Sequence, residues 1–214
     1  MFQGKPIIGI AGGIGSGKSF VAGVFGELGC LVIGSDDLAH AAYADPAVRQ
    51  TVRQWWGDGV IAPDGGVDRR AIGRIVFGNS AERQRLEALL HPIVDRIRHD
   101  RMTAAPPGVV AHVWDSPLLF ETGLNARCDA TVFVHAEPAV RLNRVAARGW
   151  DAAELNRREK SQWPLDKKRD LSDYVLDNTA DAAQTREHVS RLLSRILANN
   201  AKETARPSSS KRID

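Results

Sequence analysis

The chain lacks the features that mark membrane-spanning, secreted and disulfide-stabilised proteins. Among its 214 residues no apolar run approaches the roughly 20 that a helix needs to cross a bilayer. The N-terminal Met-Phe-Gln-Gly-Lys contains no apolar signal region. Only two cysteines occur, Cys30 and Cys128, and their spacing forms no metal or disulfide motif. We therefore expect a cytoplasmic protein whose thiols stay reduced.

The chain also has little excess charge, and its positive charge is concentrated in two segments. The formal net charge is +3 and the sequence pI is about 9.1. Residues 141–169 hold nine Lys or Arg against four acids, a balance of +5, and residues 201–214 carry +2, so the rest carries −4. This distribution favours a local phosphate-binding element over a nucleic-acid-binding face. Weak, salt-dependent association with nucleic acid is the alternative that the pI suggests.

A glycine-rich loop follows the first apolar run. Residues 12–19 read Gly-Gly-Ile-Gly-Ser-Gly-Lys-Ser, a full match to G-x-x-x-x-G-K-[ST] between the β-branched run 6–11 and the helical spacing of 19–28. Glycines let the N–H groups of such a loop close on a phosphate, and the helix N-terminus adds positive charge. Lys18 is expected to reach the β- and γ-phosphates of ATP, and Ser19 to ligate Mg²⁺. The predicted nucleotide-binding residues of the loop are Gly13, Ile14, Gly15, Ser16, Gly17, Lys18 and Ser19.

The order of apolar runs predicts an α/β protein. Four further short runs are expected to be strands, at 31–33, 109–114, 130–134 and 174–176. Stretches with helical spacing separate them, which is typical of a parallel sheet with helices on its faces. The helical stretches are expected at 19–28, 36–99 with a turn-rich break at 57–66, 68–78, 80–103, 137–148, 151–162 and 181–200. Residues 201–214 are rich in Ser, Pro and Lys and are expected to be a disordered tail.

The residues just after the strands are the candidates for a site, because ligands bind beyond the carboxyl ends of parallel strands. Asp36 follows the second strand, and we interpret it as a base or as the N-cap of the next helix. Asp115 ends the third strand as a Mg²⁺-binding carboxylate would, with a turn aspartate as the alternative. Asn178 follows the last strand and is either a nucleotide contact or a turn residue.

These segments together resemble the dephospho-coenzyme A kinase family, from Ile7 to Asn178. The resemblance is carried by the phosphate loop, Ile33-Gly34-Ser35-Asp36-Asp37-Leu38-Ala39-His40, Val67-Asp68-Arg69-Arg70, Leu86-Glu87, Leu90-His91-Pro92, Asp115-Ser116-Pro117-Leu118-Leu119-Phe120-Glu121, Arg144, Arg148, Gln162 and residues 172–178. Three positions depart from the pattern. Gly34 stands in place of an aspartate, Phe20 in place of a threonine, and Arg141 where a glutamine is common.

The resemblance implies a reaction and an architecture. The γ-phosphoryl of ATP would pass to the ribose 3′-hydroxyl of dephospho-coenzyme A, giving coenzyme A and ADP in the last step of coenzyme A biosynthesis. The fold would be a P-loop NTPase fold with a five-stranded parallel sheet. Residues 1–200 would form a single kinase domain with a helical acceptor-binding insertion at 37–105 and a helical lid at 141–170. ATP and Mg²⁺ are the expected cofactors, with no nucleic-acid or membrane partner, and a monomer or weak homo-oligomer is expected.

The resemblance also suggests roles for individual side chains. Asp36, Lys18 and Arg148 are predicted to be catalytic, and Arg144 and Asn178 to contact the nucleotide. The predicted substrate-binding residues are His40, His91, Asp115, Pro117, Leu118, Leu119 and Phe120, and the predicted metal ligands are Ser19 and Asp115. A solvated basic helix face is the alternative for the two arginines, structural roles for the histidines, and hydrophobic core for residues 117–120.

Further expectations concern the helices and the lid surface. Pro92 is expected to end or kink the helical stretch at His91. The basic residues expected on the solvated lid surface are Arg157, Arg158, Lys160, Lys167 and Lys168.

Two other classes of function fit parts of the sequence. A different small-molecule kinase, acting on a nucleoside monophosphate or shikimate, would share the loop, the sheet and the lid arginines. A non-catalytic nucleotide switch is also compatible with the loop, although the Asn-Lys-x-Asp of a guanine-specific switch is missing from the sequence.

Overall fold

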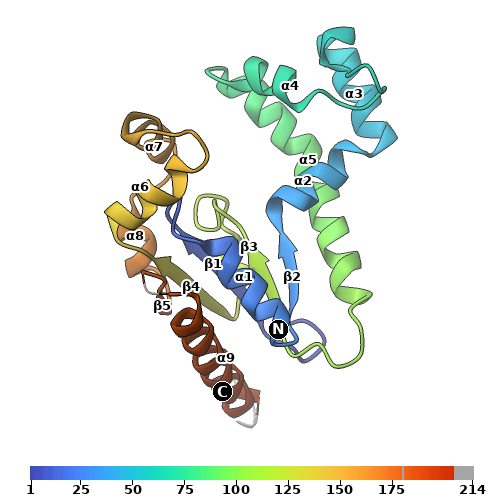
Figure 1. Ribbon diagram of the computed structural model, residues 1–214. Coiled ribbons are helices and arrows are strands. Elements are labelled where there is room, and N and C mark those ends of the chain that lie inside the picture. The colour runs from blue at the N-terminus through green and yellow to red at the C-terminus, as the bar shows by residue number, and fades with distance from the viewer. Residues whose placement is uncertain (180, 205–214) are drawn as a thin grey trace, which may run out of the picture. The chain divides into compact units, whose positions relative to one another are not determined.

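The computed structural model describes residues 1–179 and 181–204, and its contacts divide the chain into two units. The core unit comprises residues 1–32 and the described residues from 106 onward, and the helical unit comprises Ile33–Ala105. Figure 1 shows the elements of both units. Within the described residues, no helix is both long and apolar enough to cross a membrane.

A five-stranded sheet forms the centre of the core unit. Its strands lie in the order β2 (Leu31–Gly34), β3 (His112–Asp115), β1 (Ile7–Gly12), β4 (Ala130–His135) and β5 (Tyr174–Asp177). β1 pairs in parallel with β3 and β4, and β4 pairs in parallel with β5. All six residues of β1 are buried, as expected for the central strand of a sheet covered on both faces. The predicted five-stranded parallel sheet is confirmed.

The two faces of the sheet are covered by different segments. Ile8 and Ile10 of β1 pack with α1 (Lys18–Glu27) and α9 (Ala182–Thr204) in one core cluster. Ala11 belongs to a second cluster with Leu119 and Phe120, because side chains alternate along a strand. The remaining helices of this unit are η2 (Leu124–Arg127), α6 (Pro138–Ala146), α7 (Ala152–Glu159) and α8 (Leu165–Asp170).

The helical unit has a core of its own. It contains α2 (Ser35–Tyr43), α3 (Pro46–Trp56), η1 (Asp58–Val60), α4 (Arg69–Val76) and α5 (Ser80–Thr103). Capping side chains set the starts of α3 and α4. Asp45 accepts a hydrogen bond from the Ala47 N–H at 2.9 Å, and Asp68 accepts two, from Arg70 and Ala71. Val48, Val52 and Ile72 pack together in the interior.

The helical stretch predicted at 80–103 is confirmed by α5, and of the two alternatives for Pro92, an end of the helix at His91 is wrong. The helix continues through Pro92 to Thr103. Proline removes one backbone donor from the helix, but Leu86 and Leu90 before it and Ile93 after it all pack against the core of the helical unit. Tertiary packing on both sides of the proline therefore holds the helix together.

The structure also differs from the predictions at β3, α8 and α9. β3 begins at His112, three residues after the start of the predicted strand at 109. α8 was not predicted, because its sequence Leu-Asp-Lys-Lys-Arg-Asp shows no apolar periodicity. α9 runs to Thr204, so residues 201–204 of the predicted tail are helical, and residues 205–214 lie outside the described residues.

The close packing of β1 against Leu119 yields a testable prediction. A Cβ added at Gly9 would lie 2.8 Å from Leu119 Cδ2 and 2.8 Å from Cys128 Sγ. We expect Gly9→Ala to lower the free energy of unfolding by about 1–3 kcal/mol through overpacking. The cost should shrink in a Leu119→Ala background, which opens space at the same place. Urea unfolding of the two single variants and the double variant measures this coupling.

Gly23 is the matched control for Gly9. It lies inside α1, and nothing lies within 4 Å of the position of an added Cβ. Gly23→Ala should raise the free energy of unfolding by about 0.5–1 kcal/mol, because alanine costs less chain entropy in a helix. Equal costs for Gly9→Ala with and without Leu119 would contradict the described packing.

Candidate active site

The glycine-rich loop joins the carboxyl end of β1 to the first turn of α1. Gly15 and Gly17 have φ angles of +78° and +89°, a conformation that L side chains rarely adopt. Space is also closed at both positions. An added Cβ would lie 2.7 Å from the Arg141 carbonyl oxygen at Gly15 and 2.2 Å from Asn178 Nδ2 at Gly17. The loop therefore needs glycine both for its turns and for the close approach of α6 and of the residue after β5.

Lys18 bends back over the loop that precedes it. Its Nζ donates hydrogen bonds to the carbonyl oxygens of Gly12 at 2.9 Å and Gly13 at 3.1 Å. Burial lowers the pKa of the Lys18 ammonium to about 8; Asp115 opposes this shift, whereas the positive charges of Lys168, Arg148 and Arg141 add to it. Several positive charges close together repel one another, so binding of an anion among them is electrostatically favourable.

The two predicted metal ligands lie together. Ile10 of β1 is in register with Asp115 of β3, so Asp115 ends beside the loop. The Ser19 hydroxyl donates to Asp115 Oδ2 at 3.4 Å. Hydroxyl and carboxylate oxygens are hard ligands that suit Mg²⁺, which takes its other ligands from water and phosphate. The described residues contain no group of three or more His, Cys, Asp or Glu arranged to hold a metal.

Arg144 and Asn178 brace the loop. Asn178 is 3% exposed, and its Nδ2 donates to the Ser16 carbonyl at 2.7 Å while its Oδ1 accepts from the Thr185 hydroxyl at 2.9 Å. Arg144 donates to the carbonyl oxygens of Ser16 at 3.1 Å and Asn178 at 2.8 Å. Both residues, predicted as nucleotide contacts, thus hold the backbone of the loop, and their contact with nucleotide stays a prediction.

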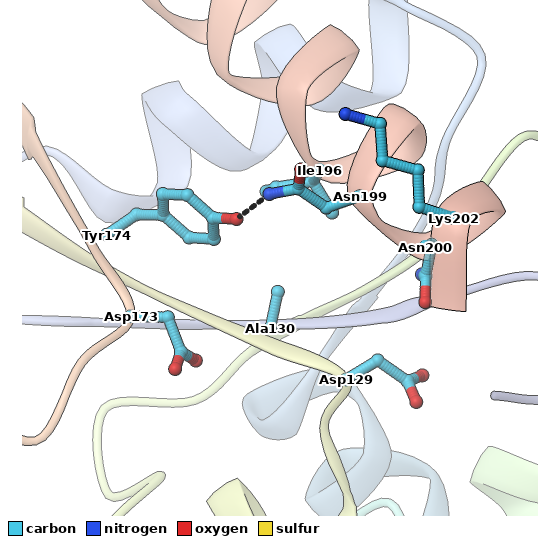
Figure 2. A pocket seen from close by; sticks show the side chains of 8 residues that line it. All are labelled: Asp129, Ala130, Asp173, Tyr174, Ile196, Asn199, Asn200 and Lys202. Atoms are coloured by element: carbon cyan, nitrogen blue, oxygen red, sulfur yellow. Dashed lines mark hydrogen bonds between the residues drawn. The ribbon is translucent and has the colours of Figure 1, made fainter. Parts of the chain in front are cut away.

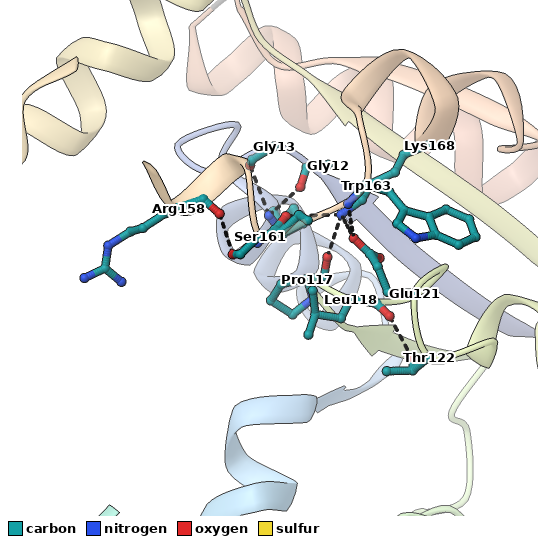
Figure 3. A network of polar contacts seen from close by, with 12 residues as sticks. Gly12, Gly13, Pro117, Leu118, Glu121, Thr122, Arg158, Ser161, Trp163 and Lys168 are labelled. Atoms are coloured by element: carbon teal, nitrogen blue, oxygen red, sulfur yellow. Dashed lines mark hydrogen bonds and ion pairs between the residues drawn. The ribbon is translucent and has the colours of Figure 1, made fainter. Parts of the chain in front are cut away.

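Arg141, Arg148 and Lys168 differ in their surroundings. Arg148 is exposed and forms no ion pair with any residue that the structure describes. Arg141 pairs with Glu159 and donates to the Ile14 carbonyl at 3.3 Å. The prediction that Lys168 is solvated is wrong. Its side chain is 0% exposed and forms an ion pair with Glu121, which lies beside it in Figure 3. Neither Arg141 nor Lys168 was predicted as a site residue, because charge spacing along a helix does not reveal burial.

For two residues of the segment after Asp115, the structure favours the alternative of hydrophobic core over the acceptor site. Leu119 and Phe120, predicted to line the acceptor site, are 0% and 3% exposed and pack on Ala11 and Phe133 as core residues. Only Leu118, at 41% exposure, presents a large apolar surface. The turn after β3 lies against the sheet, so two of its consecutive apolar side chains, Leu119 and Phe120, are buried there.

The helical unit carries the other predicted site residues. Asp36 and Asp37 lie in the first turn of α2, and His40 lies one turn further on; all three are exposed. The N-cap of α2 is Gly34, so the alternative that Asp36 caps this helix is wrong. The Asp36 carboxylate therefore accepts no capping hydrogen bond from the backbone of α2. His91 is an exposed residue of α5.

Two cavities open on the core unit. One of about 140 Å³ lies at the carboxyl end of β4 and is lined in part by Gly13, His135, Arg141 and Leu165. The other, of about 330 Å³, lies between the start of β5 and the end of α9, where Figure 2 shows Tyr174 and Asn199. Its carboxylates already accept protein hydrogen bonds, Asp129 from Met1 and Ile7 and Asp173 from Thr131. The chemistry therefore points to the end of the sheet that carries the loop.

Comparisons with known proteins agree with this geometry. A family model described as dephospho-CoA kinase matches residues 6–184. The dephospho-CoA kinase of Syntrophotalea carbinolica is 35% identical over 195 residues, 89% of this chain and 92% of that one. A crystal structure from Thermus thermophilus has a TM-score of 0.78 at 34% identity, covering 91% of this chain and 97% of the other. The dephospho-CoA kinase of Campylobacter jejuni shares the fold, with a TM-score of 0.67 at 22% identity over 92% of this chain and 99% of that one.

The brace behind the loop yields the second prediction. Asn178→Ala removes the donor to the Ser16 carbonyl and leaves the buried Thr185 hydroxyl without that acceptor. We expect the free energy of unfolding to fall by about 1–3 kcal/mol. We also expect the Kd for a non-hydrolysable ATP analogue to rise about tenfold, because the binding-competent loop is less populated. Calorimetric titration and urea unfolding measure the two effects.

Thr185→Val provides the graded control. It removes the hydroxyl that orients the Asn178 amide but leaves the bond to Ser16 in place, so its effect on the Kd should lie between wild type and Asn178→Ala. A loss of stability in Asn178→Ala with an unchanged Kd would show that the brace does not act on nucleotide binding.

Proposed function

The chain belongs to the dephospho-CoA kinase family, which phosphorylates dephospho-CoA in the final step of coenzyme A biosynthesis, and on this premise we propose which of its residues carry the reaction. ATP gives its γ-phosphoryl to the ribose 3′-hydroxyl of dephospho-CoA, and the site residues hold the phosphates, take the proton and balance the charge. The observation that carries the proposal is the meeting of Lys18, Ser19 and Asp115 at the mouth of the glycine loop.

The loop and Lys18 are proposed to bind the phosphates of ATP. The backbone N–H groups from Gly13 to Ser19 supply donors at a helix N-terminus, where the helix dipole also favours negative charge. Lys18 would exchange its bonds to Gly12 and Gly13 for phosphate oxygens. In that position the Lys18 ammonium would contact the γ-phosphate and stabilise negative charge during the transfer step. The nearby positive charges of Lys168, Arg148 and Arg141 support this role.

Ser19 and Asp115 are proposed to hold Mg²⁺. Bound there, Mg²⁺ would supply positive charge against the negative charge that develops during phosphoryl transfer. Ser19 offers its hydroxyl oxygen and Asp115 its carboxylate, the latter directly or through water. The contact between the two side chains supports this proposal.

Asp36 is proposed to take the proton of the attacking hydroxyl or to orient it. Its carboxylate is exposed in the first turn of α2 and is not the N-cap. A carboxylate in hydrogen-bond reach of a hydroxyl removes the proton as the new P–O bond forms. His40 one turn along the helix, His91 of α5 and the exposed Leu118 are proposed to contact the acceptor.

Arg148 is proposed to close on the transferring group. It is exposed, pairs with no acid in the described chain, and its charge already acts on Lys18. Guanidinium groups bind phosphate oxygens in a bidentate manner.

Residues 141–170 are proposed to act as the lid that excludes water from the site, with 37–105 as the acceptor-binding part. Cys30 and Cys128 form no disulfide within the described residues, which supports a cytoplasmic location. A monomer or weak homo-oligomer stays a prediction.

The reaction and its proposed base are tested together. We expect ADP release from MgATP with dephospho-CoA, and none above background with AMP, shikimate or no acceptor. Asp36→Asn should lower kcat at least about 100-fold, because general-base catalysis contributes about 10²- to 10⁴-fold. The Kd for the ATP analogue should stay within twofold of wild type. A coupled assay of ADP gives the rates.

Asp37→Asn is the matched control, since Asp37 is the adjacent exposed acid in the same helical turn. It should keep kcat within about threefold of wild type. Near-normal turnover by Asp36→Asn would remove Asp36 from the mechanism. Turnover by the wild type with AMP or shikimate in place of dephospho-CoA would reassign the acceptor.

A further inference from the structure

The most deeply buried charge in the core unit belongs to Lys168 of α8, at 0% exposure. Its Nζ lies 2.6 Å from Glu121 Oε1 and donates to the Pro117 carbonyl at 3.0 Å and to Gln162 Oε1 at 3.1 Å. These three acceptors match the three N–H donors of a lysine ammonium. Figure 3 shows Lys168, Glu121, Pro117 and Trp163 converging at one point.

Glu121 is held almost as tightly. Its Oε1 also accepts the Trp163 backbone N–H at 2.8 Å, and its Oε2 is buried with no hydrogen-bond partner within the described chain. Burying two ions costs desolvation free energy that their attraction often fails to exceed, and apolar replacements can be equally stable. Stability alone is therefore a weak reason for this pair. Its place in the fold suggests another.

The pair joins two segments that both serve the site. Pro117 and Glu121 belong to the turn after β3, and Pro117 follows Asp115 by two residues. Gln162, Trp163 and Lys168 belong to the last part of residues 141–170. Lys168 is 51 residues from Pro117 in sequence, so this contact ties the end of that segment to the turn that carries Asp115.

We propose that Glu121 and Lys168 are positioning residues for phosphoryl transfer. Glu121 holds the ammonium of Lys168 on the Pro117 carbonyl, which fixes the turn through Ser116 and keeps the Asp115 carboxylate directed at Ser19. The pair thus sets the geometry of the oxygen ligands offered to Mg²⁺, without touching ATP or the acceptor. The inference rests on the proposed function, since it assumes that Asp115 and Ser19 hold the metal.

The contacts explain why both members are needed. Without Glu121 the buried ammonium has no counter-charge, and without Lys168 the buried carboxylate has none. Gln162 occupies the third donor of Lys168, which leaves the ammonium no freedom to turn away from Pro117. Because the Ser19–Asp115 contact is 3.4 Å long, a small shift of the Ser116–Pro117 turn changes whether the two oxygens can share one ion.

The test removes the hold on Pro117 without leaving a buried charge. In Glu121→Gln/Lys168→Met, the glutamine oxygen still accepts from Trp163, and methionine fills most of the space of the lysine stem. Binding of a non-hydrolysable ATP analogue is titrated calorimetrically at a series of Mg²⁺ concentrations. We expect the half-saturating Mg²⁺ concentration to rise at least fivefold, with analogue binding in the absence of Mg²⁺ changed by less than twofold. In the turnover assay kcat should fall at least tenfold.

A second variant covers the case that the first does not fold. Glu121→Gln/Lys168→Gln keeps an N–H donor whose reach is one atom shorter, so it should hold Pro117 less well and raise the half-saturating Mg²⁺ concentration at least twofold. The matched control is Lys167→Met, which changes an exposed lysine one residue away that lies over the Trp163 ring. Its Mg²⁺ dependence should equal that of the wild type.

A folded double variant with wild-type Mg²⁺ dependence would overturn the proposal, as would an equal shift in Lys167→Met. These outcomes are separate from a failure of the proposed function. If the wild type did not phosphorylate dephospho-CoA, the turnover assay would show it before any variant was made. The Mg²⁺ titration of analogue binding would still report on the pair.

Discussion

The half-enclosed ammonium of Lys18 is the charge around which the site is organised. The loop carbonyls of Gly12 and Gly13 hold it, Asp115 faces it, and three further cations act on it, so that its pKa falls to about 8. Such crowding costs free energy in the free protein, and that cost is relieved when a polyphosphate enters. The local excess of positive charge in residues 141–169 follows from this need, because Arg141, Arg148 and Lys168 all come from that segment.

The other parts of the core unit keep this arrangement in place. β1 and β3 end in register, which brings Asp115 to Ser19. Asn178 and Arg144 hold the far side of the loop through the Ser16 carbonyl. Leu119 packs against Gly9 on the face of β1 that points away from α1 and α9. Glu121 belongs to the same turn as Leu119. The packing of Leu119 on Gly9, the bonds of Asn178 and Arg144, and the Glu121–Lys168 pair therefore all act on the glycine loop, β1 or the turn after β3.

The sequence predicted the parts whose signals are local. A β-branched run, a glycine loop and a helical pattern in succession identify the phosphate site, and the rule that ligands lie beyond strand ends led to Asp115. What the sequence could not give depends on contacts between distant residues. Lys168 has the same local pattern as its exposed neighbours, and only the approach of Glu121 and Pro117 shows that it is buried. Leu119 was placed at the acceptor site by the family resemblance, whereas its apolar sequence alone indicated hydrophobic core, and the core is where it lies. Pro92 was expected to end or kink the helix at His91, but the helix continues because residues on both sides of the proline pack on the core.

The proton balance of nucleotide binding tests the central claim about Lys18 most directly. A bound triphosphate favours the ammonium and raises its pKa, so above pH 8 binding must take up a proton and must weaken as the pH rises further. Calorimetric binding of the ATP analogue at pH 8.5, in buffers of different ionisation enthalpy, should show net uptake of protons. The uptake should vanish in Lys18→Arg, whose guanidinium stays protonated. Binding without proton uptake in the wild type at pH 8.5 would contradict the account.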